Sequence, residues 1–378
     1  MAVPFFSIHH SYNDAAQKSL LARWQRILEH GGFVNGPEVR ELEADLAAFL
    51  EVPEVVCCSN GSDALVLALR AADIGPGDEV LVPAFTFFAS AGAVSRCGAT
   101  PVFVDIDPVT FCIDPADAVA KTTAKTKACM AVHLYGYPVD VPALAQTLEN
   151  AAGRPIPVVE DAAQAVGAVH ASGPVGGMGI SAGWSLFPTK NLGAPGDAGF
   201  ATCMDKDVAD RMRRLREHGG GRQYYHDEVG YNFRMDSLVA AGVLELLPRL
   251  VEFNAARRVG AEHYRELFTA AGLSDAIVLP LDHPGHVYHQ FVIRAEQRDA
   301  LKDFLHAREI GCAVYYPLAL HLQPCFADLG GKAGDLPQSE AATANVLALP
   351  IYPGVTAAQR EELVAAVAEF YAQVASAH

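Results

Sequence analysis

The chain has 378 residues, enough for two domains and too many for a single small module. Apolar residues make up 51% of it and charged residues 19%, a balance that supports a sizeable buried core and excludes long disordered segments. The net charge of -16 disfavours nonspecific attraction to nucleic acid and to anionic membranes. We therefore expect a globular protein that has neither nucleic acid nor a membrane among its partners.

The sequence also bears on compartment and metal content. The longest apolar stretches carry a charge or end well short of the ~20 residues that a membrane span needs. The N-terminus lacks the basic region and the apolar core of a signal peptide, so we expect a cytoplasmic enzyme. The eight cysteines form no CxxC pair and are expected to be buried free thiols. The pairs His9-His10 and Cys57-Cys58 are too isolated to form a metal site.

The first part of the chain alternates strand and helix patterns after two opening helices. Those helices are expected over residues 13–30 and 37–50, from the spacing of their apolar residues. The strands that follow are expected at 55–58, 79–82, 101–104, 128–134 and 156–159, and the helices between them at 64–72, 88–96, 115–121 and 141–151. Alternation at this spacing predicts right-handed crossovers and an α/β fold with a mainly parallel sheet, covered by helices on both faces.

The pattern changes after about residue 250. Before it, two more strands are expected at 184–187 and 199–203, and two helices at 206–218 and 235–247. After it, the expected order is a helix at 252–271, a strand at 287–294, a helix at 297–310, a short strand at 313–315 and a closing helix at 357–374. This order predicts a smaller α+β domain. We therefore divide the chain into a large cofactor-binding domain over residues 1–250, opening helices included, and a small C-terminal domain over residues 251–378.

Polar residues that follow the strands are the first candidates for a site, because ligands in open α/β sheets bind at the carboxyl ends of strands. The loop that contains Gly61, Ser62 and Asp63 leads from one strand into a helix. Its free backbone amides and the helix dipole would bind a phosphate, although an ordinary helix cap is the alternative. Phe87 follows the next strand and could stack on a planar ring or simply fill the core.

Three further segments carry charged or polar side chains just past a strand or before a helix. Asp161 ends an apolar run, where its carboxylate could hold a protonated ring nitrogen or cap a helix. Lys190 lies in a turn rich in glycine and proline and could form a Schiff base if partly desolvated, although a lone lysine is usually solvated. Asn232 could contact a second phosphate or another subunit. A phosphate cradle, a stacking aromatic, an acid and a lysine are together the parts of a pyridoxal phosphate site.

Short motifs spread over nearly the whole chain form a specific combination. They are Gly36-Pro37-Glu38-Val39, Asn60-Gly61-Ser62-Asp63-Ala64-Leu65, Gly77-Asp78-Glu79-Val80, Val132-His133-Leu134-Tyr135-Gly136, Glu160-Asp161-Ala162-Ala163-Gln164, Ser185-Leu186-Phe187-Pro188-Thr189-Lys190-Asn191-Leu192-Gly193, Gly230-Tyr231-Asn232 and Tyr315-Tyr316-Pro317 with His321. This combination resembles the DegT/DnrJ/EryC1/StrS family of pyridoxal-phosphate nucleotide-sugar aminotransferases. The resemblance implies a fold-type I aminotransferase with pyridoxal 5'-phosphate as its cofactor.

The resemblance also implies a role for each residue of the cofactor site. Lys190 is implied to be the catalytic lysine that bonds to the cofactor, and Asp161 to pair with its ring nitrogen. Gln164 is implied to bond the ring hydroxyl, and Phe87 to lie over the ring. The phosphate is implied to be held by the loop of Gly61, by Ser62 and Asp63 within it, and by Ser185.

On the substrate side, the resemblance implies a shared site and a sugar wall. Asn232 is implied to reach the phosphate bound by a partner subunit, which makes the protein a homodimer with shared active sites. Tyr315, Tyr316 and His321 are implied to bind the sugar substrate.

The run from Phe187 to Ala194, followed by Gly196-Asp197, resembles family members that aminate C3 of a nucleotide-linked 3-keto-6-deoxyhexose. That likeness implies ping-pong transfer of an amino group from L-glutamate to a sugar carried on thymidine diphosphate. A C4 keto-sugar or cyclitol aminotransferase of the same family remains an alternative, as does a cofactor-binding regulatory protein. Ala198, Ala319 and Val239 depart from the family pattern, and the first two lie near the implied sugar side, which leaves the exact sugar open.

Overall fold

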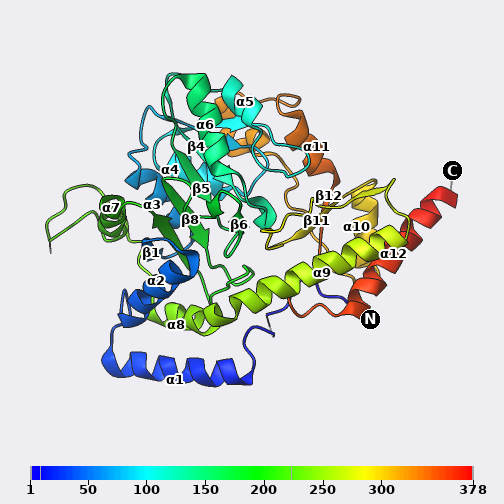
Figure 1. Cartoon of the computed structure of the whole chain (residues 1–378), viewed down its shortest axis with the longest axis horizontal. Coiled ribbons are helices and arrows are strands. Elements are labelled where there is room, and N and C mark those ends of the chain that lie inside the picture. Colours follow the sequence, from blue (N-terminus) through cyan, green and yellow to red (C-terminus); the bar gives the residue numbers. More distant parts are fainter. Residues whose placement is uncertain (1, 9, 223, 377–378) are drawn as a thin grey trace.

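The computed structural model describes residues 2–8, 10–222 and 224–376 (Figure 1). Its main sheet has seven strands, in the order β1 (Glu54–Cys58), β9 (Gly199–Cys203), β8 (Ser181–Ser185), β5 (Val158–Asp161), β4 (Thr126–Val132), β2 (Glu79–Pro83) and β3 (Thr100–Val104). Neighbouring strands run parallel except around β9, which is antiparallel to both β1 and β8. The predicted α/β fold with a mainly parallel central sheet is confirmed.

Helices cover both faces of this sheet, as the alternation of patterns predicted. One face is covered by α3 (Gly61–Ala71), α4 (Ala89–Arg96) and α7 (Lys206–Arg216). The other is covered by α2 (Pro37–Leu50), α5 (Pro115–Ala120), α6 (Val141–Ala152) and α8 (Ser237–Leu246). Neighbouring strand residues point to opposite faces of the sheet. Val56 therefore packs in the core on the side of α3, α4 and α7, and Val55 in the core on the side of α2 and α8. Because both faces are buried, the strands are mainly apolar instead of alternating with polar residues, and Glu160 and Asp161 at the end of β5 are exceptions.

Helix α1 (Asp14–His30) agrees with the predicted opening helix. Its first turn is capped by Asn13, whose side chain accepts from the backbone N–H of Ala16, and its end is set by Gly31 in the left-handed conformation. Trp24 donates from its indole N–H to the backbone oxygen of Leu238 at 2.8 Å, which ties α1 to α8. Figure 1 shows α1 lying along one edge of the molecule, next to α8.

Two strand boundaries in the large sheet differ from the prediction. The strand expected at 156–159 ends at Asp161, so this carboxylate belongs to the strand end and does not follow it. The strand expected at 184–187 runs over Ser181–Ser185. Small residues begin that strand because Leu65 of α3 packs directly on it: a Cβ added at Gly183 would lie 2.7 Å from Leu65 Cδ2. An apolar pattern cannot reveal a strand that is buried under small residues.

The C-terminal part contains a small antiparallel sheet, whose strands differ from the predicted ones. The sheet has the order β10 (Ile277–Val278), β11 (Phe291–Ala295) and β12 (Val346–Leu349). The strand predicted at 313–315 is wrong, because Ala313 makes only an isolated bridge to Ala348. The strand expected at 287–294 begins only at Phe291. The flanking helices are α9 (Leu250–Ala270), α10 (Arg298–His306), α11 (Pro337–Asn345) and α12 (Ala357–Ser376).

The long helix α9 connects the two parts of the molecule (Figure 1). Phe253, near its start, packs in the core of the main sheet, whereas Tyr264 and Phe268 pack in the core of the small sheet. Because α9 contributes residues to both cores, it fixes the position of the small sheet relative to the main sheet. The domain boundary between residues 250 and 251 stays a prediction.

All eight cysteines are unpaired, and Cys325 is the exposed exception to the expectation of buried thiols. Burial raises the pKa of the Cys58 and Cys129 thiols, which keeps these groups protonated and inert.

Among the helices of the described residues, none combines the length and the apolar character that spanning a membrane requires.

Candidate active site

One cavity of about 680 Å³ lies at the carboxyl ends of β1, β2, β4, β5 and β8. Predicted site residues from several loops line it together: Gly61, Ser62, Phe87, Asp161, Gln164, Ser185, Lys190, Tyr315 and Tyr316. Its volume lies within the range of pockets that hold small-molecule ligands or cofactors. Asp63, Asn232 and His321 do not line it.

The N-terminus of α3 forms the first wall of the cavity. Asn60 caps this helix by accepting from the backbone N–H of Asp63 at 2.9 Å. Among the described residues, no hydrogen bond reaches the amides of Gly61 and Ser62. A Cβ added at Gly61 would lie 2.6 Å from Cβ of Ser185, so only glycine lets the loop approach β8 this closely. Free amides at a helix N-terminus, flanked by two hydroxyl groups, are suited to a phosphate.

The carboxylate of Asp63 supports this loop from behind. It accepts from Ser59 Oγ at 2.5 Å and from Asn60 Nδ2 at 2.8 Å, and Arg96 pairs with its other oxygen at 2.8 Å. All of these partners belong to the protein. The structure therefore gives Asp63 the role of holding the loop's shape, and the direct phosphate contact proposed for it stays a prediction.

Asp161 faces the cavity at the end of β5. Its Oδ2 accepts from the Ser90 hydroxyl at 2.6 Å and its Oδ1 from the Ala163 amide at 3.2 Å. Burial raises the pKa of the Asp161 carboxyl, while these two hydrogen bonds and the charge of Lys190 act in the opposite direction. A buried carboxylate with spare acceptor capacity is suited to a cationic N–H donor from a ligand.

Lys190 projects into the same cavity from the turn after β8, whose shape is fixed by the hydrogen bond from its backbone N–H to the Phe187 carbonyl. Burial lowers the pKa of Lys190 to about 8, and the nearby Asp161 carboxylate opposes this shift. The amine is therefore partly neutral near neutral pH, which is the form that attacks a carbonyl carbon.

Gln164 and Tyr316 form the side of the cavity next to Asp161. Gln164 Oε1 accepts from the backbone N–H of Tyr135 at 2.6 Å, so the amide is oriented and its Nε2 donates to the Tyr316 hydroxyl at 3.3 Å. The ring of Phe87 lies 6.1 Å from the ring of Tyr316 and stays half exposed. Tyr315 lies beside Tyr316 in the same wall, and its carbonyl accepts from the Tyr135 hydroxyl.

Two predicted residues lie elsewhere in this chain. Asn232 forms an isolated bridge with Glu217 in the segment after α7. His321 lies in η3 (Leu320–Leu322), where its ring is buried and its Nε2 lies 3.2 Å from Glu340 Oε1. The role of Asn232 in a partner's site and the role of His321 in sugar binding stay predictions.

Two cavity residues that sequence reasoning missed come from the segment before β11. His289 and Gln290 both line the cavity and are nearly fully buried. His289 Nδ1 lies 3.1 Å from Asn191 Oδ1, which links it to the lysine turn. The Oε1 atom of Gln290 is buried without a hydrogen-bond partner in the described chain. Their segment matched a strand pattern, and nothing in the sequence placed it against a turn some 100 residues away.

A second pair, His133 and Glu160, belongs to the motifs of the sequence but had no role assigned to it there. Glu160 is completely buried and accepts from His133 Nε2 at 3.0 Å. It also accepts from the amides of Gly176, Met178 and Gly179 at 2.7 to 3.0 Å. Because the Val139 amide donates to Nδ1 of His133, the ring's proton lies on Nε2 and points to Glu160. The ring itself lines the cavity, so this network fixes one of its walls.

These residues fit one kind of ligand, a planar ring compound with a phosphate and a basic ring nitrogen. Unpaired amides suit the phosphate, Asp161 suits the ring nitrogen and Lys190 suits a carbonyl carbon. Within the described residues, no group of three or more His, Cys, Asp or Glu side chains could hold a metal ion, and His9 lies outside those residues.

Comparison with known proteins gives matches over nearly the whole chain. A model of the DegT/DnrJ/EryC1/StrS aminotransferase family matches residues 14–368. A pleiotropic regulatory protein of Geobacillus stearothermophilus is 44% identical over 98% of this chain and 99% of its own. The UDP-N-acetyl-3-dehydro-alpha-D-glucosamine 3-aminotransferase of Acidithiobacillus ferrooxidans is 42% identical over 91% and 90%. The dTDP-3-amino-3,4,6-trideoxy-alpha-D-glucose transaminase of Streptomyces venezuelae is 37% identical over 98% and 97%.

A solved structure gives the same result for the fold. The crystal structure of DesV from S. venezuelae, described as a complex with a ketimine intermediate, matches with a TM-score of 0.92 at 38% identity. The match covers 98% of this chain and 98% of that one. The described fold is therefore shared from the opening helices to the small sheet.

Proposed function

Because the chain belongs to the DegT/DnrJ/EryC1/StrS aminotransferase family, we propose that it transfers an amino group from L-glutamate to C3 of a nucleotide-linked keto-sugar. The proposed acceptor is a 3-keto-6-deoxyhexose on thymidine diphosphate. The observation that carries the proposal is the meeting of Lys190, Asp161 and the free amides of α3 in one cavity. The protein is an aminotransferase, and pyridoxal 5'-phosphate is the cofactor of its family.

When bound, pyridoxal phosphate supplies an aldehyde that exchanges amino groups and a ring that withdraws electrons from the reacting carbon. The chain would hold it through the amides of Gly61 and Ser62 and the hydroxyl of Ser185 at the phosphate, and through Asp161 at the ring nitrogen. Gln164 would bond the ring hydroxyl with its oriented amide, and Phe87 would cover one face of the ring.

In this proposal, Lys190 accepts and releases the proton that is transferred during the reaction. Its pKa of about 8 lets the amine hold a proton at Nζ in one step and release it in the next near neutral pH. Asp161 stays desolvated and anionic next to the bound ring nitrogen, so it keeps that nitrogen protonated. His133 is fixed by Glu160 and keeps the strand-end wall in place.

Attack at C3 and the dTDP carrier rest on sequence likeness. The lysine turn resembles C3-aminating members, and the S. venezuelae relative carries both a 3-amino sugar and dTDP in its name. A UDP-linked N-acetyl sugar is the second candidate acceptor, because the A. ferrooxidans relative names UDP and position 3 at higher identity. Ala198 lines the cavity at the point where the chain departs from the family pattern, so it is a candidate for selecting the sugar.

A regulatory role is the candidate from a different class, and the name of the G. stearothermophilus relative favours it. The cavity argues for catalysis, because a regulator that only binds the cofactor does not need a lysine with a lowered pKa beside a buried carboxylate. The two roles differ in one measurable property, which is turnover of an amino donor.

We also propose a homodimer in which Asn232 of each chain reaches the partner's phosphate site. The segment before Asn232 exposes Tyr224, Tyr225 and Val229, and α1 exposes Leu21 and Leu28. Large apolar side chains that are exposed on a loop and on a helix in this way are candidates for a surface that another chain covers.

The first experiment tests the cofactor half of the reaction. The protein is purified with pyridoxal phosphate, its visible spectrum is recorded, and L-glutamate is added without any sugar. The proposal expects a long-wavelength band that glutamate bleaches, together with one equivalent of 2-oxoglutarate. The Lys190→Ala variant is the control and should lack this band. A spectrum that glutamate leaves unchanged would favour the regulatory role.

The second experiment identifies the sugar by running the reaction backwards. The holoenzyme receives 2-oxoglutarate with a dTDP-linked 3-amino-3,6-dideoxyhexose, its 4-amino isomer or a UDP-linked 3-amino sugar, and glutamate is measured. Rapid glutamate formation from the first sugar supports the proposal. A preference for the 4-amino isomer would refute amination at C3. A preference for the UDP-linked sugar would show that the carrier is UDP and not dTDP.

The dimer is tested by mixing two defective variants. Lys190→Ala and Asn232→Asp proteins are combined after mild dissociation, with light scattering as a check on the oligomeric state. If each site uses both chains, the mixture regains activity that neither parent has. A mixture that is no more active than its parents would contradict the proposal that each active site uses both chains.

A further inference from the structure

His289 has one ring nitrogen that the protein satisfies and one that it leaves bare. The side chain is 7% exposed and lines the same cavity as Lys190. Its Nδ1 lies 3.1 Å from Asn191 Oδ1. No group of the described residues donates to its Nε2, which is open to the space that the ring lines. The ring therefore has a hydrogen-bonding position left for a group inside the cavity.

A chain of side-chain amides decides which of these nitrogens carries the proton. Asn254 on α9 donates from Nδ2 to the Val166 carbonyl at 3.0 Å, so its Oδ1 is left to accept. Asn191 donates from Nδ2 to that Oδ1 and to the Val287 carbonyl, at 2.8 and 3.1 Å. Because both amide hydrogens of Asn191 are used in this way, its Oδ1 accepts from His289. The single proton of a neutral ring therefore lies on Nδ1, and Nε2 is an acceptor.

The surroundings of the ring keep it neutral. Burial lowers the pKa of His289 well below its ordinary value, and the charges of Lys190 and Arg257 act in the same direction. Arg257 lies on α9 and donates from Nη1 to the backbone carbonyls of Tyr288 and His289, at 3.2 and 3.1 Å. A neutral imidazole with so low a pKa accepts a hydrogen bond from an amine without removing the amine's proton.

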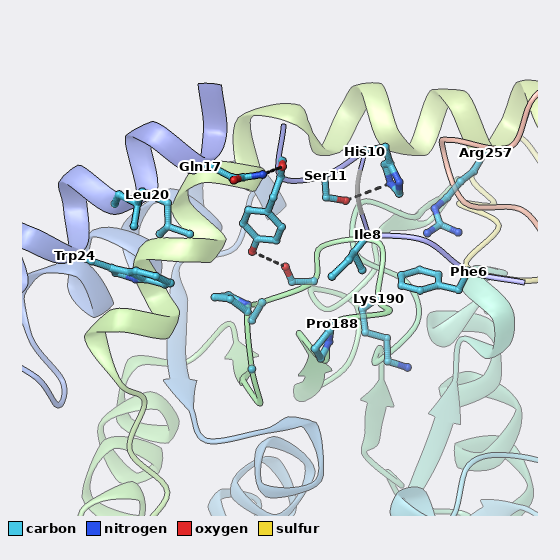
Figure 2. Close-up of a pocket in the computed structure, with 16 residues that line it drawn as sticks. Phe6, Ile8, His10, Ser11, Gln17, Leu20, Trp24, Pro188, Lys190 and Arg257 are labelled. Carbon is cyan, nitrogen blue, oxygen red and sulfur yellow. Dashed lines mark hydrogen bonds between the residues drawn. The ribbon is translucent and has the colours of Figure 1, made fainter. Parts of the chain in front are cut away.

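Lys190 supplies unpaired donors in the same cavity. Among the described residues, no hydrogen bond or ion pair reaches its Nζ. Figure 2 shows the stem of Lys190 beside Pro188 and its amine directed away from Ile8. The Asp161 carboxylate also attracts this amine, but in the proposed function Asp161 pairs with the ring nitrogen of the bound cofactor. The bare nitrogen of His289 then offers the lysine amine an uncharged acceptor.

We propose that His289 is a positioning residue for Lys190, whose free amine donates a hydrogen bond to Nε2 of the ring and is thereby oriented for proton transfer. The proposal rests on the proposed function, in which Lys190 takes and returns a proton at Nζ. Asn191 links the two side chains, because it follows Lys190 in the turn and also fixes the ring. Orientation matters because a misplacement of about 1 Å in a reacting group can slow a reaction by about 100-fold.

Two substitutions of His289 separate positioning from packing. In His289→Asn, the amide nitrogen lies near the place of Nδ1 and keeps the bond to Asn191, but no acceptor reaches the cavity. In His289→Gln, the longer side chain puts its amide oxygen near the place of Nε2 and loses the bond to Asn191. The half-reaction with L-glutamate should slow by about 100-fold in His289→Asn and stay within about tenfold in His289→Gln.

The kinetic signature is a change in rate at constant glutamate binding. The apparent KM should stay within about twofold in both variants, because the change acts on the proton step. Glutamate with deuterium at its α-carbon should show a larger isotope effect in His289→Asn than in the unchanged protein, since proton transfer becomes slower than the other steps. A histidine that only packs predicts the opposite order of rates, with His289→Asn near normal and His289→Gln slow. That order would overturn the proposal.

His286 gives a matched control. It is buried three residues earlier, but its ring bonds to the Tyr288 amide and to the Gly136 backbone, and it does not line the cofactor cavity. His286→Asn should lower the melting temperature while the rate and the isotope effect stay within about twofold. Equal losses of rate in His286→Asn and His289→Asn would show that damage to this segment slows the reaction, which would refute positioning by Nε2.

A spectroscopic measurement tests the contact without turnover. Protein with ¹⁵N in its histidine rings is loaded with pyridoxamine phosphate, which leaves the Lys190 amine free. The His289 resonances are assigned by their absence from His289→Asn. In Lys190→Met the Nε2 resonance should shift, because its hydrogen bond is lost, while Nδ1 keeps its proton. An Nε2 resonance that does not respond to Lys190→Met, or a proton on Nε2, would contradict the contact.

Together these measurements distinguish this inference from the proposed function. If the Nε2 resonance responds to Lys190→Met but glutamate never bleaches the band of the unchanged protein, the proposed transamination fails and the contact stands. If glutamate reacts at one rate in the unchanged protein and in both variants of His289, the positioning role fails alone.

Discussion

Two consecutive carboxylates of β5 lie in opposite environments. Glu160 points to the packed face of the strand, where one histidine and three amides satisfy it. Asp161 points to the cavity, where two hydrogen bonds leave acceptor capacity and burial raises its pKa. The same chemical group therefore holds the structure on one face and stays available for a ligand on the other. The difference comes from the alternation of side chains along a strand, not from the residue type.

This comparison predicts that substitutions on the cavity face change turnover and that substitutions on the packed face change stability. The largest effect is expected for Lys190→Ala. It should lower turnover by about 10⁴-fold or more, since the proposed nucleophile and proton carrier are both lost. The melting temperature of the apoprotein should not fall, because burial makes the amine's charge unfavourable. Full turnover in this variant would break the assignment of the cavity face to chemistry.

Asp161→Ala is expected to lower turnover by about 10²- to 10³-fold, the usual effect of removing one stabilising group from an active site. The free energy of unfolding of the apoprotein should change little, because the carboxyl is already desolvated and its pKa is raised. Both quantities are measured on the same preparation, by steady-state assay and by denaturant unfolding. A large loss of stability with normal turnover would place Asp161 in the same class as Glu160.

Glu160→Ala should do the reverse. Its removal leaves His133 and the amides of Gly176, Met178 and Gly179 unsatisfied in the core, which is expected to cost about 3 to 5 kcal/mol of stability. The exposed Glu149 on α6 is the control, and Glu149→Ala should stay within about 0.5 kcal/mol. Equal stability of the two variants would show that the buried network is not structural.

Gly61→Ala sharpens the comparison at the phosphate cradle. The added Cβ would lie 2.6 Å from Ser185, so the loop must move, at an expected cost of about 1 to 3 kcal/mol in stability. The moved amides should also weaken the affinity for pyridoxal phosphate, measured by fluorescence or absorbance titration. Gly75→Ala is the matched control, because its Cβ would lie 3.4 Å from Arg70 Nη1. Unchanged cofactor affinity in Gly61→Ala would contradict a phosphate site at this loop.

The smallest effect is a shift in pH dependence. The rate at which the apoprotein forms its visible band with pyridoxal phosphate should rise with pH and level off near pH 8, where the Lys190 amine becomes neutral. Below that pH the amine is protonated and does not attack. An ordinary lysine would give a rise that continues toward 10.5. A profile of that ordinary shape would show that burial does not activate Lys190.

Much of the site could be predicted from sequence because its parts obey local rules. Gly61 and Ser62 open a helix directly after a strand, and Asp161 and Lys190 follow or end strands of the same sheet. Parallel strands bring such ends to one edge, so the order of elements alone predicts that these residues meet.

The parts that sequence did not reveal depend on contacts between distant segments. His289 and Gln290 reach the cavity because their segment leaves the small sheet before β11 and packs against the lysine turn. β12 forms only by pairing with β11, and the strand at 313–315 fails because a single bridge replaces a ladder. None of these arrangements follows from local propensity, since short apolar runs form strands or turns according to their partners.

The sequence by itself predicted the α/β alternation, because periodicity is a local property, whereas strand-end chemistry together with the family resemblance pointed to the loops and the lysine of the candidate site. Only the tertiary structure decided which charges are left unpaired. Arg257 is one of several arginines on α9 in the sequence, and the fold alone buries it beside Lys190 and away from every described acid. Burial and pairing are properties of the whole packed chain, because they depend on which surfaces other segments cover.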